Sequence, residues 1–193
     1  ETREYDVMRA LVDPYSYRER LTLPQLLING AGDQFFLPDS WQFYVDELKG
    51  PTYLCYVPNA GHGGGGKDGR NSLFSFINYI VTDTPLPKYA WSFPDPHSIR
   101  VETPSKPARV QLWQATNPDA RDFRVDVFGR HYKPTDLEDQ GGGVYIGRVE
   151  KPEQGWTAFL VQLEFDAPGE RPLMLSSPVR IVPDTTPFTW APP

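Results

Sequence analysis

The sequence predicts an α/β layer followed by an antiparallel β-sandwich, with the boundary near residue 88. Two apolar runs, residues 26–28 and 53–57, are separated by a helix candidate, which is the pattern of parallel strands joined by a crossover helix. After Thr84-Pro85-Leu86-Pro87 prolines recur and the helical period disappears. Short runs that alternate apolar and polar residues follow, and this alternation is typical of antiparallel strands.

The first part of the chain, residues 1–88, is expected to begin with a helix. Residues 1–12 have helical spacing, and the helix should end at Asp13-Pro14 because the residue before a proline avoids helical dihedral angles. Strands are expected at residues 25–29 and 52–57. The unbroken apolar centre of the first run suits a strand that is buried on both faces.

Two further helices are expected in this part. The one between the strands begins at Asp39, which fits a capping box with Gln42, and Gly50 suits its C-terminal end. The last helix covers residues 71–81. The apolar stripes that we expect to be buried are Trp41, Tyr44, Val45 and Leu48 in the former and Leu73, Phe74, Ile77 and Ile80 in the latter.

The second part, residues 89–193, is expected to contain about seven short strands. The clearest alternation is Phe159, Val161, Leu163 and Phe165. Such strands separated by Pro, Gly, Asn and Asp turns predict a sandwich of immunoglobulin or fibronectin type. The runs that support it are residues 99–101, 110–113, 123–127, 144–149, 158–165 and 179–182.

The composition excludes several classes of protein. A formal net charge of −6 without a basic stripe argues against a nucleic-acid partner. No segment approaches the length of a membrane span. The single cysteine, Cys55, excludes an internal disulfide framework and is expected to be a small core residue.

The chain begins with Glu inside a predicted helix, so we expect a fragment or a processed product, and the lack of a signal peptide says nothing about localisation. Two parallel strands alone would leave a long edge and apolar surface uncovered. We therefore expect residues 1–88 to be stable only together with an upstream N-terminal segment of the same protein.

An acid and a histidine follow the two predicted parallel strands. Gly30-Ala31-Gly32-Asp33 closes the first run and Asn59-Ala60-Gly61-His62 closes the second. Ligand sites of open parallel sheets lie at the carboxyl ends of the strands. Alone, Asp33 reads as a turn aspartate that bonds its own backbone, and His62 as a surface loop residue. Their order along the chain favours Asp33 and His62 as two members of a catalytic site.

The glycine-rich stretch after His62 fits three patterns. Gly61 to Lys67 matches the phosphate-binding loop, but Asp68 replaces the Ser or Thr that should bind magnesium and would repel phosphate. The run that begins at His62 also spells an oxyanion-loop motif, which belongs early in a sheet and upstream of the nucleophile. A catalytic histidine on a loop after the last strand agrees best with the order of elements.

Other candidate site residues have simpler explanations. Asp39 competes with Asp33 as the acid, but helix capping explains it without catalysis. His97 and His131 fall in the sandwich and are expected at its surface. Residues 136–139 lack the spacing of a calcium loop. We expect no cofactor and no metal ion.

The nucleophile of such a site is missing from this sequence. In α/β-hydrolases the triad runs Ser, then Asp, then His, with the serine in a Gly-x-Ser-x-Gly elbow. No Gly-x-Ser-x-Gly occurs in the chain. The sequence therefore predicts an acid and a base whose nucleophile lies upstream.

Two stretches resemble a known family. The PhoPQ-activated pathogenicity-related proteins are similar to this chain over residues 26–39 and 56–62. The first of these stretches ends in Gly-Asp-Gln-Phe-Phe-Leu-Pro-Asp. The resemblance covers essentially the whole chain, which would match the C-terminal portion of the family. It implies an α/β-hydrolase fold, Asp33 as the triad acid, His62 as the base, an upstream serine, and a periplasmic or secreted location in Gram-negative bacteria.

We therefore expect a serine hydrolase that acts by acyl transfer on a small ester or peptide, with part of its site on this chain. The alternative, from a different class, is a non-catalytic binding protein on a hydrolase scaffold whose sandwich recognises a peptide or glycan. Aromatic residues such as Trp113 and Trp156 motivate the alternative.

Overall fold

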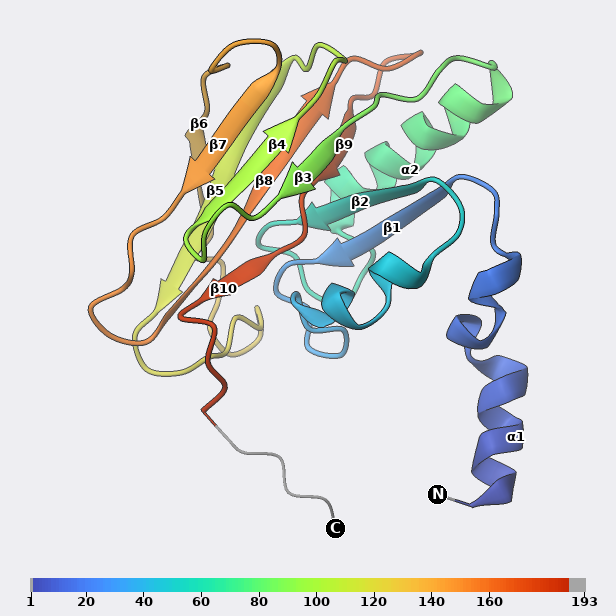
Figure 1. Cartoon of the computed structure of the whole chain (residues 1–193), viewed down its shortest axis with the longest axis horizontal. Coiled ribbons are helices and arrows are strands. Elements are labelled where there is room, and N and C mark those ends of the chain that lie inside the picture. The colour runs from blue at the N-terminus through green and yellow to red at the C-terminus, as the bar shows by residue number, and fades with distance from the viewer. Residues whose placement is uncertain (1, 188–193) are drawn as a thin grey trace.

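Three sheets organise residues 2–187, the part of the chain that this computed structural model describes (Figure 1). In the first, β1 (Gln25–Gly30) and β2 (Thr52–Val57) pair in parallel. The second is antiparallel, in the order β10 (Arg180–Val182), β8 (Trp156–Phe165), β5 (Arg109–Asn117) and β6 (Lys133–Asp136), and β9 (Leu173–Ser176) also pairs with β8. The third contains β3 (Ala90–Ser92), β4 (Ser98–Glu102) and β7 (Val144–Arg148).

The N-terminal helix and both parallel strands agree with the sequence prediction. Helix α1 (Arg3–Val12) ends at Asp13, before Pro14, and the Thr2 side chain caps its first turn. A 3₁₀ helix, η1 (Pro14–Arg20), follows. None of the α1 residues is buried, and the helix stands apart from the sheets (Figure 1).

The predicted helix between the strands is wrong. Two short 3₁₀ helices, η2 (Ser40–Phe43) and η3 (Val45–Glu47), occupy this region. The Asp39 side chain makes no capping bond; its carboxylate instead pairs with Arg121 at 2.7 Å. The Trp41 indole donates to the Val179 carbonyl at 2.8 Å. These contacts with distant residues replace the regular helix that local propensity favoured.

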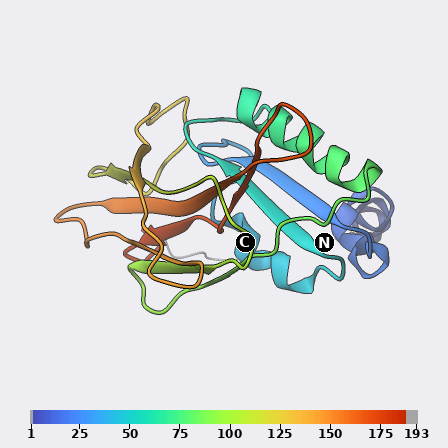
Figure 2. The ribbon, with the colours of Figure 1, turned by 90° about the horizontal axis from the view of Figure 1, so that it is seen from above.

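Helix α2 (Gly66–Val81) begins earlier than predicted and buries a different face. Its buried side chains include Ser72, Ser75, Phe76 and Tyr79. Ser72 accepts a hydrogen bond from the Met174 amide, so the small side chains let the helix lie close to β9. Figure 2 shows α2 running along one face of the β1–β2 pair. The residues expected to be buried are 41–50% exposed: Leu73, Phe74, Ile77 and Ile80.

The antiparallel part departs from the prediction at four places. Residues 123–127, expected as a strand, form a loop with a turn: the Val125 amide bonds Gly32 in the α/β layer, and the Arg124 carbonyl accepts a turn bond from the Val127 amide. Strands β3, β6 and β9 were not foreseen. All four residues of β6 are exposed, so this edge strand carries no apolar alternation.

The antiparallel sheets pack face to face around a core of aliphatic side chains. Strand β8 lies at its centre, and Phe159, Val161 and Leu163 are fully buried. A Cβ atom built on Gly147 of β7 would meet the Val161 and Leu112 side chains, which shows how closely the two sheets approach. The same core includes Phe76 and Tyr79 of α2, so it is continuous with the α/β layer.

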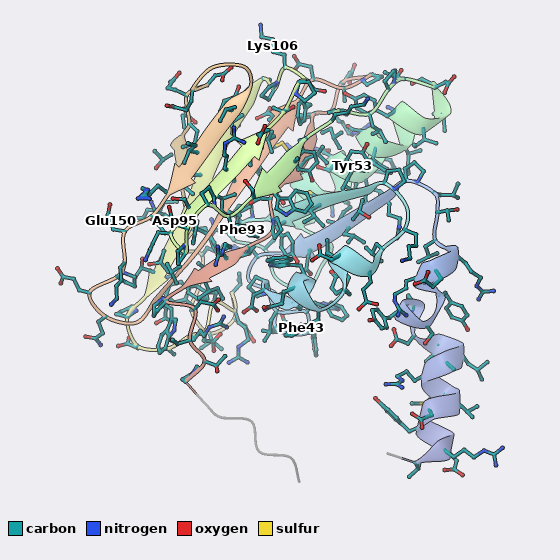
Figure 3. The ribbon with its side chains drawn as sticks, in the orientation of Figure 1. Phe43, Tyr53, Phe93, Asp95, Lys106 and Glu150 are labelled. Atoms are coloured by element: carbon teal, nitrogen blue, oxygen red, sulfur yellow. The ribbon has the colours of Figure 1, made fainter. Side chains whose placement is uncertain are left out.

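Strand β2 joins the two parts of the molecule. Tyr53 contacts the rings of Phe76 and Tyr89, with centroids 5.5 and 6.3 Å away (Figure 3). On the edge of β2 that faces away from β1, the Leu54 amide donates to the Tyr89 hydroxyl at 3.0 Å. The Tyr56 amide donates to the Ser176 hydroxyl at 2.9 Å. On this edge, side-chain hydroxyl groups accept the amide hydrogen bonds that a neighbouring strand would otherwise accept.

Cys55 lies in this shared core and should be unreactive in the folded protein. It is 1% exposed, and burial raises the pKa of its thiol to about 12. Because the unfolded thiol ionises near pH 9, its contribution to stability is full below that pH and is lost as the pH rises toward 12. In the full-length protein, iodoacetamide at pH 8 should label Cys55 only in urea, as measured by mass spectrometry of the peptide that contains it. Raising the pH from 8 to 10 should lower the urea midpoint more in wild type than in Cys55→Ala, and an equal fall would contradict this.

The Asp39–Arg121 ion pair should stabilise the fold more than a surface pair does. The side chains are 16% and 15% exposed, so Asp39→Asn leaves a largely buried guanidinium without its partner charge and should cost roughly 2–4 kcal/mol. Glu164→Gln breaks the more exposed pair with Arg109 and should cost less than about 1 kcal/mol. Urea denaturation of the full-length protein measures the loss of unfolding free energy in both variants. Equal losses would show that the Asp39 pair stabilises the fold no more than the exposed pair does.

Candidate active site

The turn after β1 holds Asp33 in one orientation. Its side chain is 4% exposed. One carboxylate oxygen, Oδ1, accepts hydrogen bonds from the amides of Phe35 at 2.7 Å and Phe36 at 3.1 Å. The other oxygen, Oδ2, lies 3.1 Å from Nδ1 of His62. Asp33 is therefore both a turn aspartate and the partner of His62, with one oxygen in each role.

The turn after β2 presents His62 at the surface of the same edge. The side chain is 45% exposed, and its backbone amide donates to the Gln34 side-chain oxygen at 3.3 Å. The backbone then runs from residue 64 to residue 66 with positive φ angles, a conformation that glycine adopts without strain, and enters α2. The two residues proposed from the sequence thus lie in direct contact.

Two glycines in the turn after β1 allow neighbouring backbone to approach it closely. A Cβ atom on Gly30 would lie 2.3 Å from the Ala60 carbonyl oxygen. One on Gly32 would lie 2.5 Å from a methyl carbon of Val125 and 2.9 Å from the Phe123 carbonyl oxygen. A side chain at Gly30 would push the two turns apart, and one at Gly32 would push away the segment between β5 and β6, which explains the Gly-Ala-Gly-Asp sequence in physical terms.

Aromatic rings flank the imidazole. The Phe35 ring packs edge-on against His62 with a centroid distance of 4.8 Å, and the Phe36 ring lies at 5.4 Å. Both phenylalanines are largely exposed, at 68% and 60%. Phe43, at 74% exposed, projects outward from η2 nearby in the chain (Figure 3). Two exposed aromatic rings, those of Phe35 and Phe36, therefore lie against the candidate base.

A pocket of about 520 Å³ opens beside His62. Its wall combines both parts of the molecule, because Asp68 comes from α2 while Asp126 and Arg130 come from the segment between β5 and β6. An imidazole with one nitrogen held by a carboxylate can accept a proton at the other nitrogen. The arrangement is chemically suited to general acid–base catalysis on a molecule bound in this pocket.

The other residues singled out in the sequence lie away from this pair or have structural partners. His97 is half-buried and His131 is exposed, both in the antiparallel part. The Trp113 indole donates to Gln162, and that of Trp156 donates to the Thr185 carbonyl. Both tryptophans are partly buried and pack against the core.

Residues 2–187 hold no cluster of three or more His, Cys, Asp or Glu side chains suited to a metal ion. No helix in the same range is long and apolar enough to cross a membrane.

Sequence reasoning missed the contribution of the segment between β5 and β6. Residues 123–127 alternate apolar and polar side chains, and this pattern predicted a strand instead of a loop that reaches the site. The Val125 amide donates to the Gly32 carbonyl at 2.9 Å. No local pattern could have revealed this bond, since its partners lie far apart in the chain.

Comparison with known proteins identifies the family. Autocrine proliferation repressor protein A of Dictyostelium discoideum is 33% identical over 208 residues, a region that covers 94% of this chain and 42% of that protein. The chain thus spans less than half the length of this relative. Residues 1–124, which include both turns of the candidate site, match the family described as PhoPQ-activated pathogenicity-related protein. The resemblance inferred from the motifs is confirmed, and the chain belongs to the PhoPQ-activated pathogenicity-related protein family.

Proposed function

We propose that this chain supplies the acid and the base of a serine hydrolase that cleaves small esters or peptides by acyl transfer. The observation that supports it best is the 3.1 Å contact between Asp33 Oδ2 and His62 Nδ1 at the ends of adjacent parallel strands. The nucleophilic serine comes from an upstream segment of the longer protein, because this chain has no Gly-x-Ser-x-Gly motif.

In the proposed mechanism each residue has one role. Asp33 holds the Nδ1–H of His62, fixes the tautomer of the ring and stabilises the imidazolium. Nε2 of His62 takes the proton from the serine hydroxyl as the oxygen attacks the acyl carbon, and later gives that proton to the leaving group. The amides of Phe35 and Phe36 prevent the Asp33 carboxylate from rotating away.

The fold that this proposal implies is an α/β-hydrolase sheet followed by an immunoglobulin- or fibronectin-like sandwich. The parallel β1–β2 pair, with Asp33 before His62 in the chain, agrees with the order of acid and base in that superfamily. By its family we also propose a periplasmic or secreted location, which fractionation of cells that express the full-length protein would test.

The hydrolase proposal is tested by two substitutions in the full-length protein. Asp33→Asn keeps the shape of the side chain but removes the charge that orients the imidazole, and should lower kcat by roughly 10³–10⁴-fold. His62→Ala should lower it at least as much. Turnover of 4-nitrophenyl acetate is the assay, and urea denaturation verifies that the variants fold. His97→Ala, which removes a histidine outside the segment that contacts the site, is the control; equal turnover in all three would refute the proposal.

A second candidate function is a binding protein that no longer catalyses. Two observations favour it: the relative from Dictyostelium is named a proliferation repressor, which suggests signalling, and exposed Phe35 and Phe36 form an apolar surface around His62. Such surfaces are typical of contact sites for other proteins.

An active-site probe separates the two candidates. A fluorophosphonate reacts with an activated serine, so it should label the wild-type full-length protein and not the His62→Ala variant if the protein is a hydrolase. If the wild-type protein is folded and is still not labelled, the result favours the binding protein.

A further inference from the structure

The segment between β5 and β6, residues 118–132, leaves the antiparallel sheet and contacts both turns that carry the candidate acid and base. On the turn after β1, the Val125 amide donates to the Gly32 carbonyl at 2.9 Å, and the Tyr132 hydroxyl donates to the Ala31 carbonyl at 3.3 Å. Both acceptors come directly before Asp33 in the chain.

The same segment is bound to the turn after β2. Asn59 and Tyr132 form a reciprocal pair. The side-chain Nδ2 of Asn59 donates to the Tyr132 backbone carbonyl at 2.9 Å, and the Tyr132 backbone amide donates to Asn59 Oδ1 at 2.9 Å. Asn59 has a φ of 59°, in the left-handed region that residues other than glycine rarely adopt. Arg130 adds a bond from Nε to the Asn59 carbonyl at 3.2 Å.

Tyr132 is thus one residue that bonds both turns. It is 4% exposed, and its bond to Ala31 is buried. Burial also raises the pKa of its hydroxyl, which stays protonated and remains a donor to Ala31. Val125 reinforces the link to the turn after β1, since a Cβ atom built on Gly32 would lie 2.5 Å from a methyl carbon of its side chain.

We propose that Asn59 and Tyr132 are positioning residues that set the separation between Asp33 and His62. The inference rests on the proposed function, and it makes the antiparallel part a component of the site and not only an attached recognition module. The β1–β2 ladder ends at Gly30 and Val57, before either candidate residue. Beyond that point two backbone bonds continue between the turns, both before Asp33 and His62, and the bonds of Asn59 and Tyr132 add to them. A displacement of about 1 Å between catalytic groups can cost about 10²-fold in rate.

The test uses a substitution that removes the link without straining the backbone. Asn59→Gly keeps a residue that tolerates positive φ and deletes both side-chain bonds to Tyr132. Asp83→Gly is the matched control, because Asp83 also has positive φ, 51°, and lies at the far end of α2. In the full-length protein, Asn59→Gly should lower kcat for 4-nitrophenyl acetate by about 10-fold with KM within about two-fold, whereas Asp83→Gly should change neither.

A second pair of variants removes one hydroxyl each. Tyr132→Phe deletes the bond to Ala31, and Tyr79→Phe deletes a comparable bond from a buried tyrosine, 5% exposed, to the Asp166 carbonyl. Tyr132→Phe should lower kcat in the same direction as Asn59→Gly but less. Tyr79→Phe should leave kcat unchanged even where both variants lose similar stability.

A spectroscopic signal keeps this test separate from the test of hydrolysis. The Nδ1–H proton of His62, assigned by its absence in His62→Ala, reports the hydrogen bond to Asp33 in spectra of ¹⁵N-histidine-labelled full-length protein. It should shift upfield or broaden in Asn59→Gly and Tyr132→Phe and stay in place in Asp83→Gly and Tyr79→Phe. An unmoved signal in the first two variants would overturn the positioning role, whatever their kcat. Wild-type protein without turnover would contradict hydrolysis, while the signal would still decide whether Asn59 and Tyr132 hold the pair.

Discussion

The parallel register of β1 and β2 is the constraint on which the candidate site depends. Gly30 faces Val57 at the last rung, so the two chains leave the sheet side by side. The pairing continues into the turns through bonds from the Ala31 amide to the Val57 carbonyl and from the Gly32 amide to the Ala60 carbonyl, both at 2.9 Å. A slip of one residue would turn each side chain of a strand to the other face and carry its turn out of reach of the other.

Much of this arrangement could be predicted from the sequence because its determinants are local. Asp13-Pro14 marks the end of α1, and the unbroken apolar runs mark the two parallel strands. The contact between Asp33 and His62 follows from chain order, since successive parallel strands bring their carboxyl ends to one edge. Here the local signal and the tertiary structure agree.

The sequence was misleading where distant partners decide the local structure. The Asp39 carboxylate suited a helix cap but pairs with Arg121, far away in the chain, and the expected helix is replaced by short turns. In α2 the apolar stripe expected to be buried lies outward. Ser72 and Ser75 face β9 on the buried side, where they make hydrogen bonds to the β9 backbone and to the loop before it. A periodic pattern identifies an amphipathic helix, but it does not identify the surface against which each face packs.

The hydroxyl groups of Tyr89 and Ser176 also determine how the parallel sheet can be extended. They bond the outward amides of Leu54 and Tyr56, so two of the donors with which this edge of β2 could recruit another strand are already occupied. Antiparallel proteins often protect exposed edges against association with charges or prolines; here two side chains of the neighbouring unit serve that purpose. Within residues 2–187 the more open edge of this sheet is therefore that of β1, and an additional strand, from this polypeptide or from another, would join most readily beside it.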